Sequence, residues 1–337
     1  MGVLALAGCA TPGIDYTARV PAGSLEAASY RSVAVERFDG PGGIWFASRF
    51  EDMLASATLD GARWFTAAYP GERPDGVYEG MIEVDWIDEY HERDIDRQCV
   101  EWDGIFDCER RADVVKHCVS FEVEVTVSPA LFDARTGEIV WSGRYSGDAR
   151  ERNCETLGEV GSFRDGRHPR DGYRNRHRWA GFGYGYYGGY VVDELIREAA
   201  ADTLPAIRRD IAPYNRRAKA KLMTEAVDPV VAGDARFKLA VDAAKKDNFL
   251  TACTLFEELA AENPGAPALT FNLAACAEAS GDFETAQLLY AEVAQSRFEL
   301  PGLMEDALKR IGQRRAGEQE LEWLTGTSPE DSAEPGS

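Results

Sequence analysis

The sequence predicts two structural parts in one chain: an α+β N-terminal domain, in which helices pack on a mainly antiparallel sheet, followed by an all-α helical repeat module. Residues 77–90 and 118–132 alternate apolar and polar side chains, as strands with one buried face do. Residues 231–297 instead space their apolar residues as helices do, and they match themselves at an offset of 34. A length of 337 residues also favours two domains over one.

The first domain is expected over residues 29–212. It begins with a strand, because residues 31–38 alternate apolar and polar side chains. A Gly-Pro-Gly-Gly breaker follows, and residues 44–57 then have the spacing of an amphipathic helix. The expected apolar face of this helix consists of Trp45, Phe46, Phe50, Met53 and Leu54. A short strand is expected at 63–68, and a helix over 191–210 closes the domain.

A β-hairpin is expected between the two long strands. Asp103-Gly104 favours a two-residue turn, because a type I′ turn needs positive φ at both positions. In that register Cys99 faces Cys108, and three apolar pairs share one face: Ile82 with Val125, Val84 with Val123, and Trp86 with Phe121. The other face carries Glu83, Asp85, Glu122 and Glu124, which we interpret as a solvated surface rather than a Ca²⁺ site. A third strand over 139–148 is followed by a long loop.

Seven cysteines allow three disulfides once Cys9 is set aside. Cys99 and Cys108 flank the Asp103-Gly104 turn, and a hairpin centred near Arg135-Thr136 places Cys118 roughly opposite Cys154. Cys253 and Cys276 are symmetric about the helix breaker Asn263-Pro264-Gly265-Ala266. Disulfides imply an exported protein. The alternative is buried, inert thiols, which is more plausible for Cys253 and Cys276 than for the others.

The run Leu6-Ala7-Gly8-Cys9 resembles the lipobox of bacterial lipoproteins. The resemblance implies cleavage before Cys9 and a lipid on its thiol, so residues 1–9 are interpreted as a truncated lipoprotein signal peptide. Ala10 is not the aspartate that retains such proteins in the inner membrane, which implies the periplasmic face of the outer membrane. Residues 10–28 are expected to form a tether. The alternative is an ordinary buried N-terminal segment, since no Lys or Arg precedes Cys9.

The first domain resembles a domain shared by three envelope proteins: the curli secretion channel lipoprotein, the lipoprotein activator of penicillin-binding proteins, and the N-terminal domain of the Tol-system β-propeller protein. The stretches that carry the resemblance are SVAVERFDG, LFDARTGEIVWSG and VVDELIREAAADTLPAI. They imply an α+β sandwich over roughly residues 29–212.

The helical part, expected over 213–316, resembles tetratricopeptide repeats. The residues that match at the 34-residue offset are Leu239 with Leu273, Ala240 with Ala274, Ala243 with Ala277, Phe249 with Phe283, Ala252 with Ala286, and Phe256 with Tyr290. Helices at 214–227 and 303–315 are expected to cap the two repeats. Residues 317–337 are expected to be disordered, because they are rich in charged and small residues.

No catalytic constellation is found in the sequence, and neither a cofactor nor a metal site is expected. The four histidines include no i, i+4 pair, and His117-Cys118 has no partner motif for zinc. A net charge of −21 argues against binding to nucleic acid. After Cys9 no apolar run is long enough to span a membrane, so the only membrane attachment expected is the lipid.

Two features of the long loop are candidate contacts with a protein partner. The simpler interpretations are a solvated flexible loop for the arginines and a tethering loop that packs its own rings on the domain for the tyrosines. The candidate residues are Arg164, Arg167, Arg170, Arg174, Arg176, Arg178, Tyr184, Tyr186 and Tyr187. The function expected is that of a non-enzymatic, lipid-anchored periplasmic adaptor or regulator that binds envelope proteins through its helical repeats. The alternative is a subunit of an oligomeric outer-membrane secretion channel of the curli-channel type, against which the charged residues 93–117 weigh.

Overall fold

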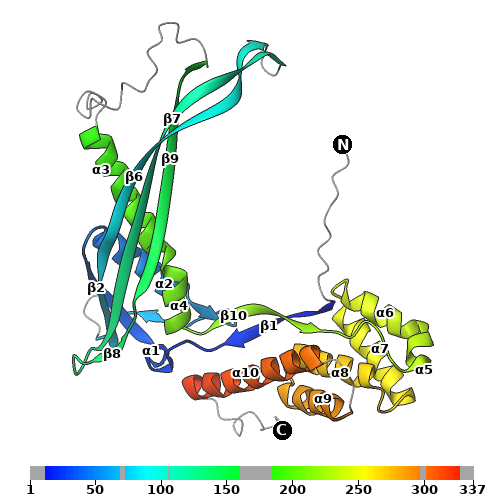
Figure 1. Cartoon of the computed structure of the whole chain (residues 1–337). Coiled ribbons are helices and arrows are strands. Elements are labelled where there is room, and N and C mark those ends of the chain that lie inside the picture. The colour runs from blue at the N-terminus through cyan, green and yellow to red at the C-terminus, as the bar shows by residue number, and fades with distance from the viewer. Residues whose placement is uncertain (1–11, 69–72, 105–106, 160–183, 297–300, 327–337) are drawn as a thin grey trace. The chain divides into compact units, whose positions relative to one another are not determined.

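The computed structural model describes residues 12–68, 73–104, 107–159, 184–296 and 301–326 (Figure 1). The chain divides into two compact units. The sheet unit consists of Ser29–Ala57 and Arg63–Ile211, and the helical unit consists of Met1–Ala28, Thr58–Ala62 and Ala212–Ser337.

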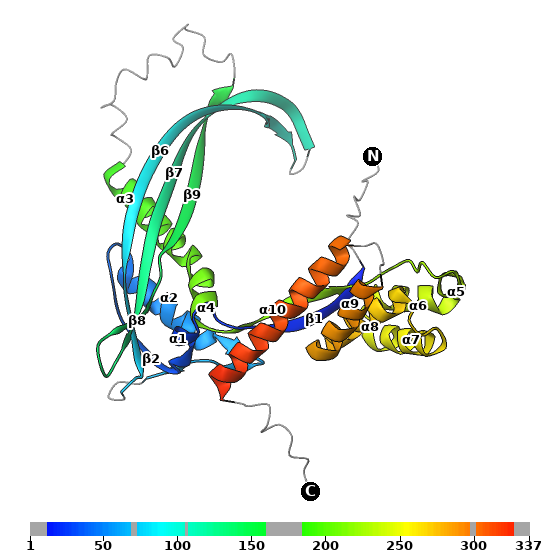
Figure 2. The same ribbon diagram turned by 60° about the horizontal axis from the view of Figure 1, so that its bottom comes forward.

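The sheet unit is built on the strand order β5-β2-β6-β7-β8, with β9 also paired to β7. The strands are β2 (Ser32–Asp39), β5 (Thr66–Ala67), β6 (Gly76–Asp103), β7 (Asp107–Asp133), β8 (Ile139–Ser142) and β9 (Tyr145–Glu159). β2 is parallel to both of its neighbours, whereas the pairings of β7 with β6, β8 and β9 are antiparallel. Figure 2 shows β6, β7 and β9 continuing side by side as a curved ribbon beyond the helices.

Three helices build the core of the sheet unit: α2 (Gly43–Ser56), α3 (Tyr184–Asp202) and α4 (Leu204–Ile211). Phe38 of β2 lies 4.9 and 5.2 Å from the rings of Phe46 and Phe50 on α2, and Phe50 in turn contacts Tyr78 on β6. α3 lies against β7 and β9. Gly147 of β9 permits this approach, because a Cβ at that position would lie 2.0 Å from the carbonyl oxygen of Ala199.

The predicted helix at 44–57 is confirmed, and so is most of its apolar face. Phe46, Phe50, Met53 and Leu54 are buried. Trp45 departs from the prediction, because it is half-buried with the guanidinium of Arg49 5.2 Å from its ring centre. Helical spacing therefore identified the buried stripe but included one residue at its margin.

The register of the β6–β7 hairpin differs from the prediction. Asp103 pairs with Asp107, whereas a turn formed by Asp103-Gly104 alone would place Trp102 opposite Ile105. Ile82 pairs with Val127 and Val84 with Val125, a shift of two residues that keeps each side chain on its expected face.

A β-bulge then changes the pairing of Trp86. The register shifts between Val84 and Trp86, so Trp86 lies opposite Glu124 instead of Phe121 and is 38% exposed. Its indole N–H donates to the Glu124 carboxylate, while the hydroxyl of Thr126 donates to Asp85 at 2.7 Å. An extra residue on one strand of a pair is what a bulge adds, and no alternation pattern reveals where it occurs.

The third strand is longer and more polar than predicted. The expected strand over 139–148 is divided into β8 and β9, and β9 continues to Glu159 through residues expected to form a loop. Cross-strand ion pairs accompany this continuation, with Arg150 2.8 Å from Glu122 and Arg152 3.0 Å from Glu92. The strand therefore lacks the apolar alternation by which the sequence would reveal it.

In the helical unit, β1 (Gly13–Val20) pairs antiparallel with β10 (Tyr214–Lys221), and this corrects two predictions. Residues 10–28 are not a simple tether, because they contain β1 and α1 (Leu25–Ser29). The helix expected over 214–227 is a strand for its first part. The sequence of β10, YNRRAKAK, is rich in good helix formers, but pairing with β1 and burial of Ala220 outweigh that weak preference.

The described residues after β10 form α5 (Pro229–Gly233), α6 (Ala235–Ala244), α7 (Phe249–Glu262), α8 (Pro267–Ser280), α9 (Phe283–Gln295) and α10 (Pro301–Thr325). α10 includes residues 317–325, which had been expected to be disordered. Buried side chains such as Leu321 and Ile311 on α10 supply the reason, since a helix with apolar contacts is ordered where composition alone suggests otherwise. The short strands β3 (Thr58–Leu59) and β4 (Ala62–Arg63) pair with each other.

All three predicted disulfides are present. Cys118 lies directly opposite Cys154 between β7 and β9, with a Cα–Cα distance of 4.0 Å. Cys253 on α7 and Cys276 on α8 are 5.9 Å apart by the same measure. The pairing of Cys99 with Cys108 is confirmed, but not its register: Cys99 pairs with Arg111 across the ladder, and the bond joins diagonal positions 5.7 Å apart.

Candidate interaction sites

A buried carboxylate on α8 gathers polar groups from three other elements of the helical unit. Glu278 is fully buried, and Arg310 of α10 donates to it twice, at 2.6 and 2.8 Å. The hydroxyl of Tyr16 on β1 donates to the same carboxylate at 2.7 Å, and the hydroxyl of Tyr290 on α9 donates at 3.0 Å. Four donors thus compensate for the large cost of burying a charge.

The electrostatics of this cluster follow from burial and from the charge of Glu278. Burial raises the pKa of Tyr16 to about 12, and the nearby negative charge acts in the same direction. Burial and the same carboxylate also raise the pKa of Tyr290. Burial lowers the pKa of Arg310, but its hydrogen bonds to Glu278 outweigh that effect and the pKa lies above its usual value. The cluster is therefore an ion pair capped by neutral tyrosines, and its donors are engaged in holding β1 against the helices.

A buried asparagine provides a second link between the β-ribbon and the helices. Asn272 of α8 accepts the backbone N–H of Met223 at 2.8 Å and donates to the carbonyl oxygen of the same residue at 3.0 Å. Ile14, Ala220 and Leu222 join the same apolar core. The ribbon formed by β1 and β10 is thus an integral part of the helical unit, which the sequence did not indicate.

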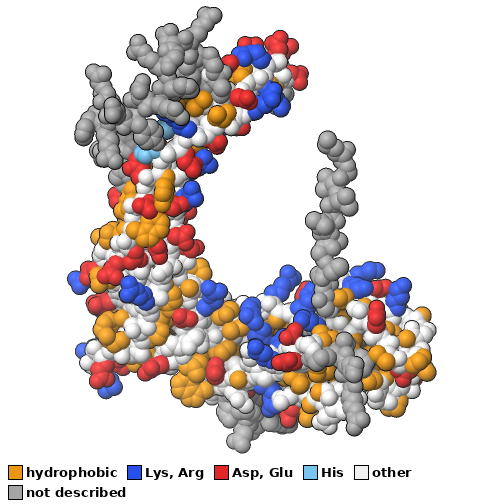
Figure 3. All heavy atoms as spheres, in the orientation of Figure 1, with side chains coloured by type: hydrophobic (Ala, Val, Ile, Leu, Met, Phe, Trp, Pro, Cys, Tyr) orange, Lys and Arg blue, Asp and Glu red, His pale blue; other side chains and the backbone are white. Residues whose placement is uncertain are grey.

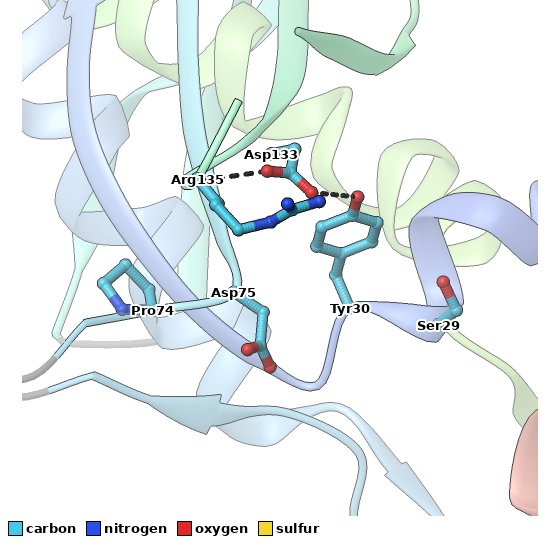
Figure 4. A pocket seen from close by; sticks show the side chains of 6 residues that line it. All are labelled: Ser29, Tyr30, Pro74, Asp75, Asp133 and Arg135. Atoms are coloured by element: carbon cyan, nitrogen blue, oxygen red, sulfur yellow. Dashed lines mark hydrogen bonds between the residues drawn. The ribbon is translucent and has the colours of Figure 1, made fainter. Parts of the chain in front are cut away.

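A shallow polar depression in the sheet unit surrounds the hairpin turn after β7 (Figure 4). Its lining residues are Ser29, Tyr30, Pro74, Asp75, Asp133 and Arg135. The carboxylate of Asp133 accepts the Tyr30 hydroxyl and the backbone N–H of Arg135, each at 2.9 Å (Figure 4). It also accepts the backbone N–H of Thr136 at 2.8 Å. The hydrogen bond from Thr136, followed by that from Tyr30, lowers the pKa of Asp133. This carboxylate is committed to holding the turn.

The extended part of β6, β7 and β9 has two chemically different faces. One face, which we call the ion-pair face, carries Glu92, Asp96, Lys116, Glu122, Arg150 and Arg152. Lys116 lies 2.8 Å from Asp96, and both arginines form the cross-strand pairs described above. Acidic and basic side chains are interspersed over the part of the hairpin that is visible in Figure 3.

The opposite face brings two histidines together. His91 of β6 and His117 of β7 have nearly parallel rings, with centroids 5.4 Å apart and an interplanar angle of 18°. Nδ1 of His91 lies 3.3 Å from Nε2 of His117, and Nε2 of His91 lies 2.8 Å from Oε1 of Glu89. Sequence reasoning missed this pair because the two residues are 26 apart, so only the strand register could have revealed it.

The residues proposed from sequence for lipidation and for electrostatic partner contact lie outside the described residues. These are Cys9 and the six arginines Arg164, Arg167, Arg170, Arg174, Arg176 and Arg178. The backbone of Tyr184, Tyr186 and Tyr187 is described, and it begins α3 rather than forming the expected loop. Glycine costs about 1 kcal/mol in a helix relative to alanine, but Gly185, Gly188 and Gly189 do not stop this helix.

The described part of the chain contains neither a metal-site cluster nor a membrane-spanning helix. Within it, no group of three or more His, Cys, Asp or Glu side chains has the arrangement of a metal site. Within it, too, no helix has both the length and the apolar character needed to cross a membrane.

Comparison with known proteins gives only distant structural similarity. No known protein family and no curated protein matches the chain. Among solved structures, the chain is similar to a candidate lipoprotein from Caulobacter crescentus CB15, with 15% identity and a TM-score of 0.25 over 56% of this chain and 92% of that one. It is similar to a minor lipoprotein from Acinetobacter baumannii, with 10% identity and a TM-score of 0.22 over 57% and 98% of the two chains. A variant of PelC from Paraburkholderia phytofirmans, described as a dodecamer, matches with 15% identity and a TM-score of 0.21 over 58% and 99%.

Proposed function

We propose that this protein is a non-enzymatic, lipid-anchored periplasmic adaptor that binds a protein of the cell envelope through α6–α9. The observation that carries the proposal is the repetition of local geometry at an offset of 34 residues. Phe237 meets Phe256 edge-to-face at 6.0 Å and 62°, and 34 residues later Phe271 meets Tyr290 at 5.0 Å and 63°. That offset and those aromatic positions are typical of tetratricopeptide repeats.

The caps of the second helix in each pair repeat in the same way. Asn248 accepts the backbone N–H of Thr251 at the start of α7, and Asp282 accepts that of Thr285 at the start of α9. Helical repeats of this kind commonly hold a peptide or a helix on the surface that stacked helices form. The repeats therefore support a binding function better than any catalytic one.

Exposed leucines on these helices provide residues with which the partner can be located. Leu239, Leu250 and Leu288 are 56, 76 and 67% exposed on α6, α7 and α9. Ile44 on α2 of the sheet unit is 91% exposed and serves as a matched control for a large apolar side chain at the surface.

The test is site-specific photo-crosslinking of the full chain in intact cell envelope. A photoreactive amino acid is placed in turn at Leu250, Leu288 and Ile44, and the adducts are identified by mass spectrometry. We expect one defined protein adduct from the two helical positions and none from the control. Adducts only from Ile44 would assign partner binding to the sheet unit and reject the proposed role of the repeats.

The arginines between 164 and 178 are proposed to speed association with an acidic partner, as suggested by their density in an otherwise acidic chain. Charges at the edge of a protein–protein interface act mainly on the association rate. Neutralising all six should therefore slow association with the crosslinked partner and weaken its dependence on salt. An unchanged rate and salt dependence would reject this role.

A second candidate function, a subunit of an oligomeric secretion channel, is favoured by one observation. β6 and β7 contain 28 and 27 residues, whereas strands of about 5–6 residues are usual. The test is the mass of the purified, lipidated protein in solution by light scattering. A single-chain mass would reject this alternative, and a discrete ring-sized mass would replace the adaptor proposal.

A further inference from the structure

We propose that His91 and His117 form a binding site for one divalent transition-metal ion of the class that prefers imidazole ligands, on the surface of the β6–β7 hairpin. The distance between Nδ1 of His91 and Nε2 of His117 is 3.3 Å. Zinc–imidazole bonds measure about 2.0–2.1 Å, and a tetrahedral angle then separates two nitrogen ligands by about 3.3–3.4 Å. The two ring nitrogens thus already have the spacing of ligands to one ion, and rotation about the broad histidine χ2 torsion can aim their lone pairs.

Glu89 sets the tautomer that such a site needs. Its Oε1 lies 2.8 Å from Nε2 of His91, so the carboxylate accepts the Nε2 proton and leaves the lone pair on Nδ1, the atom that faces His117. A carboxylate that accepts the other ring N–H of a ligating histidine is the usual outer partner at metal sites, where it fixes the ring and makes it more basic.

The residues around His117 affect how well its ring can bind a cation. Its ring is half-buried, and its Nε2 faces Nδ1 of His91. Glu155 is the β9 partner of His117 in the ladder, and its negative charge favours a cation at this position. Arg93 is the β6 partner of His117 and opposes one. The disulfide from Cys118 to Cys154, one residue further along both strands, holds β7 and β9 in this register.

The site is open rather than closed. The side chains of His91 and Glu89 are 39 and 37% exposed, and histidine side chains reach the surface of the hairpin in Figure 3. Two protein nitrogens leave the remaining coordination positions to water, so binding is expected to be reversible. Imidazole ligands suit Zn²⁺, Cu²⁺ and Ni²⁺ but not Mg²⁺ or Ca²⁺, and among the former Cu²⁺ should bind most tightly.

The test is isothermal titration of the full-length, metal-free protein with ZnCl₂ at pH 7.5, with all three disulfides intact. We expect one ion per chain. His91→Gln and His117→Gln should each weaken binding at least tenfold, and Glu89→Ala about tenfold. The matched control is the double variant His168→Gln/His177→Gln, which removes the other two histidines of the chain and should leave the affinity unchanged.

A variant that gains affinity separates this proposal from loss of folding. Arg93→Gln removes the opposing cation, so Zn²⁺ should bind severalfold more tightly, and a misfolded hairpin cannot produce that result. The proposal is overturned if the unaltered protein binds no Zn²⁺, if His91→Gln and His117→Gln retain its affinity, if the His168→Gln/His177→Gln control loses it, or if Arg93→Gln fails to tighten binding.

Discussion

Glu278 on α8 and Arg310 on α10 form a doubly hydrogen-bonded ion pair in the interior of the helical unit, and the hydroxyls of Tyr16 and Tyr290 complete the coordination of the carboxylate. The pair and its tyrosines connect α10 with α8 and α9, the helices of the second repeat, and with the strand β1. Each buried charge of the pair has a partner, and this matters because a buried charge that loses its partner strongly destabilises the fold.

We expect Arg310→Met to lower the free energy of unfolding of the helical unit by about 3–5 kcal/mol, because it leaves the Glu278 charge buried without its cation. Urea denaturation followed by circular dichroism measures this loss. The matched control is Arg236→Met, which removes the cation of an exposed pair with Glu262 and should have a much smaller effect. Equal losses of unfolding free energy in the two variants would show that burial does not determine how much these ion pairs contribute to stability.

Alkaline pH should destabilise the helical unit through Tyr16. Its pKa is raised from 10.0 to about 12 in the folded state, so the folded chain holds the phenolic proton more tightly than the unfolded chain. This stabilisation is complete below pH 10 and is lost as the pH rises from 10 through 12. We expect the free energy of unfolding to fall across that window and to fall less steeply in Tyr16→Phe. An identical slope in both proteins would contradict the assignment to Tyr16.

Cys9 is predicted to carry the lipid. Protein extracted from cell membranes should have the intact mass of a chain that begins at a diacylated or triacylated Cys9, and Cys9→Ser should release it into the soluble periplasmic fraction. Attachment through acyl chains contributes about 0.8 kcal/mol per buried CH₂, so loss of the thiol should abolish it. Cys99→Ser is the control. It removes a cysteine outside the lipobox, so this variant should remain bound to the membrane. An unmodified Cys9 would reject the lipobox interpretation.

Local patterns predicted the elements whose stabilising contacts are close in sequence or periodic. The helix α2 was predicted because Phe46, Phe50 and Leu54 recur at helical spacing, and the bond between Cys99 and Cys108 because the two residues flank a turn. The strand β10 was missed because YNRRAKAK favours a helix in isolation and becomes a strand only against β1, about 200 residues earlier in the chain.

The candidate sites were less predictable than the fold, for a related reason. Glu278 and Arg310 are 32 residues apart, and Tyr16 and Glu278 are 262 apart, so no spacing rule connects them. His91 and His117 meet only in the observed register, which already differs from the predicted one where Asp103 pairs with Asp107, and a slip of one residue would place them on opposite faces. The tyrosine contacts proposed for a loop fall at the start of α3, where glycine content gave the wrong expectation.

The two disulfides of the sheet unit should differ in their contributions to stability. This difference tests whether they stabilise the fold by lowering the entropy of the unfolded chain. On the chain-entropy model, the bond from Cys118 to Cys154, with a separation of 36, contributes about 4 kcal/mol, and the bond from Cys99 to Cys108, with a separation of 9, about 2–3 kcal/mol. We therefore expect the double variant Cys118→Ser/Cys154→Ser to lose more stability in urea than Cys99→Ser/Cys108→Ser.

Cys118 is also fully buried between β6 and β9, so its serine variant places a hydroxyl where a sulfur packed, which acts in the same direction. Comparison with Cys118→Ala/Cys154→Ala isolates the crosslink from that added polarity. If the alanine pair loses no more stability than Cys99→Ala/Cys108→Ala, loop length does not determine the contribution of these bonds.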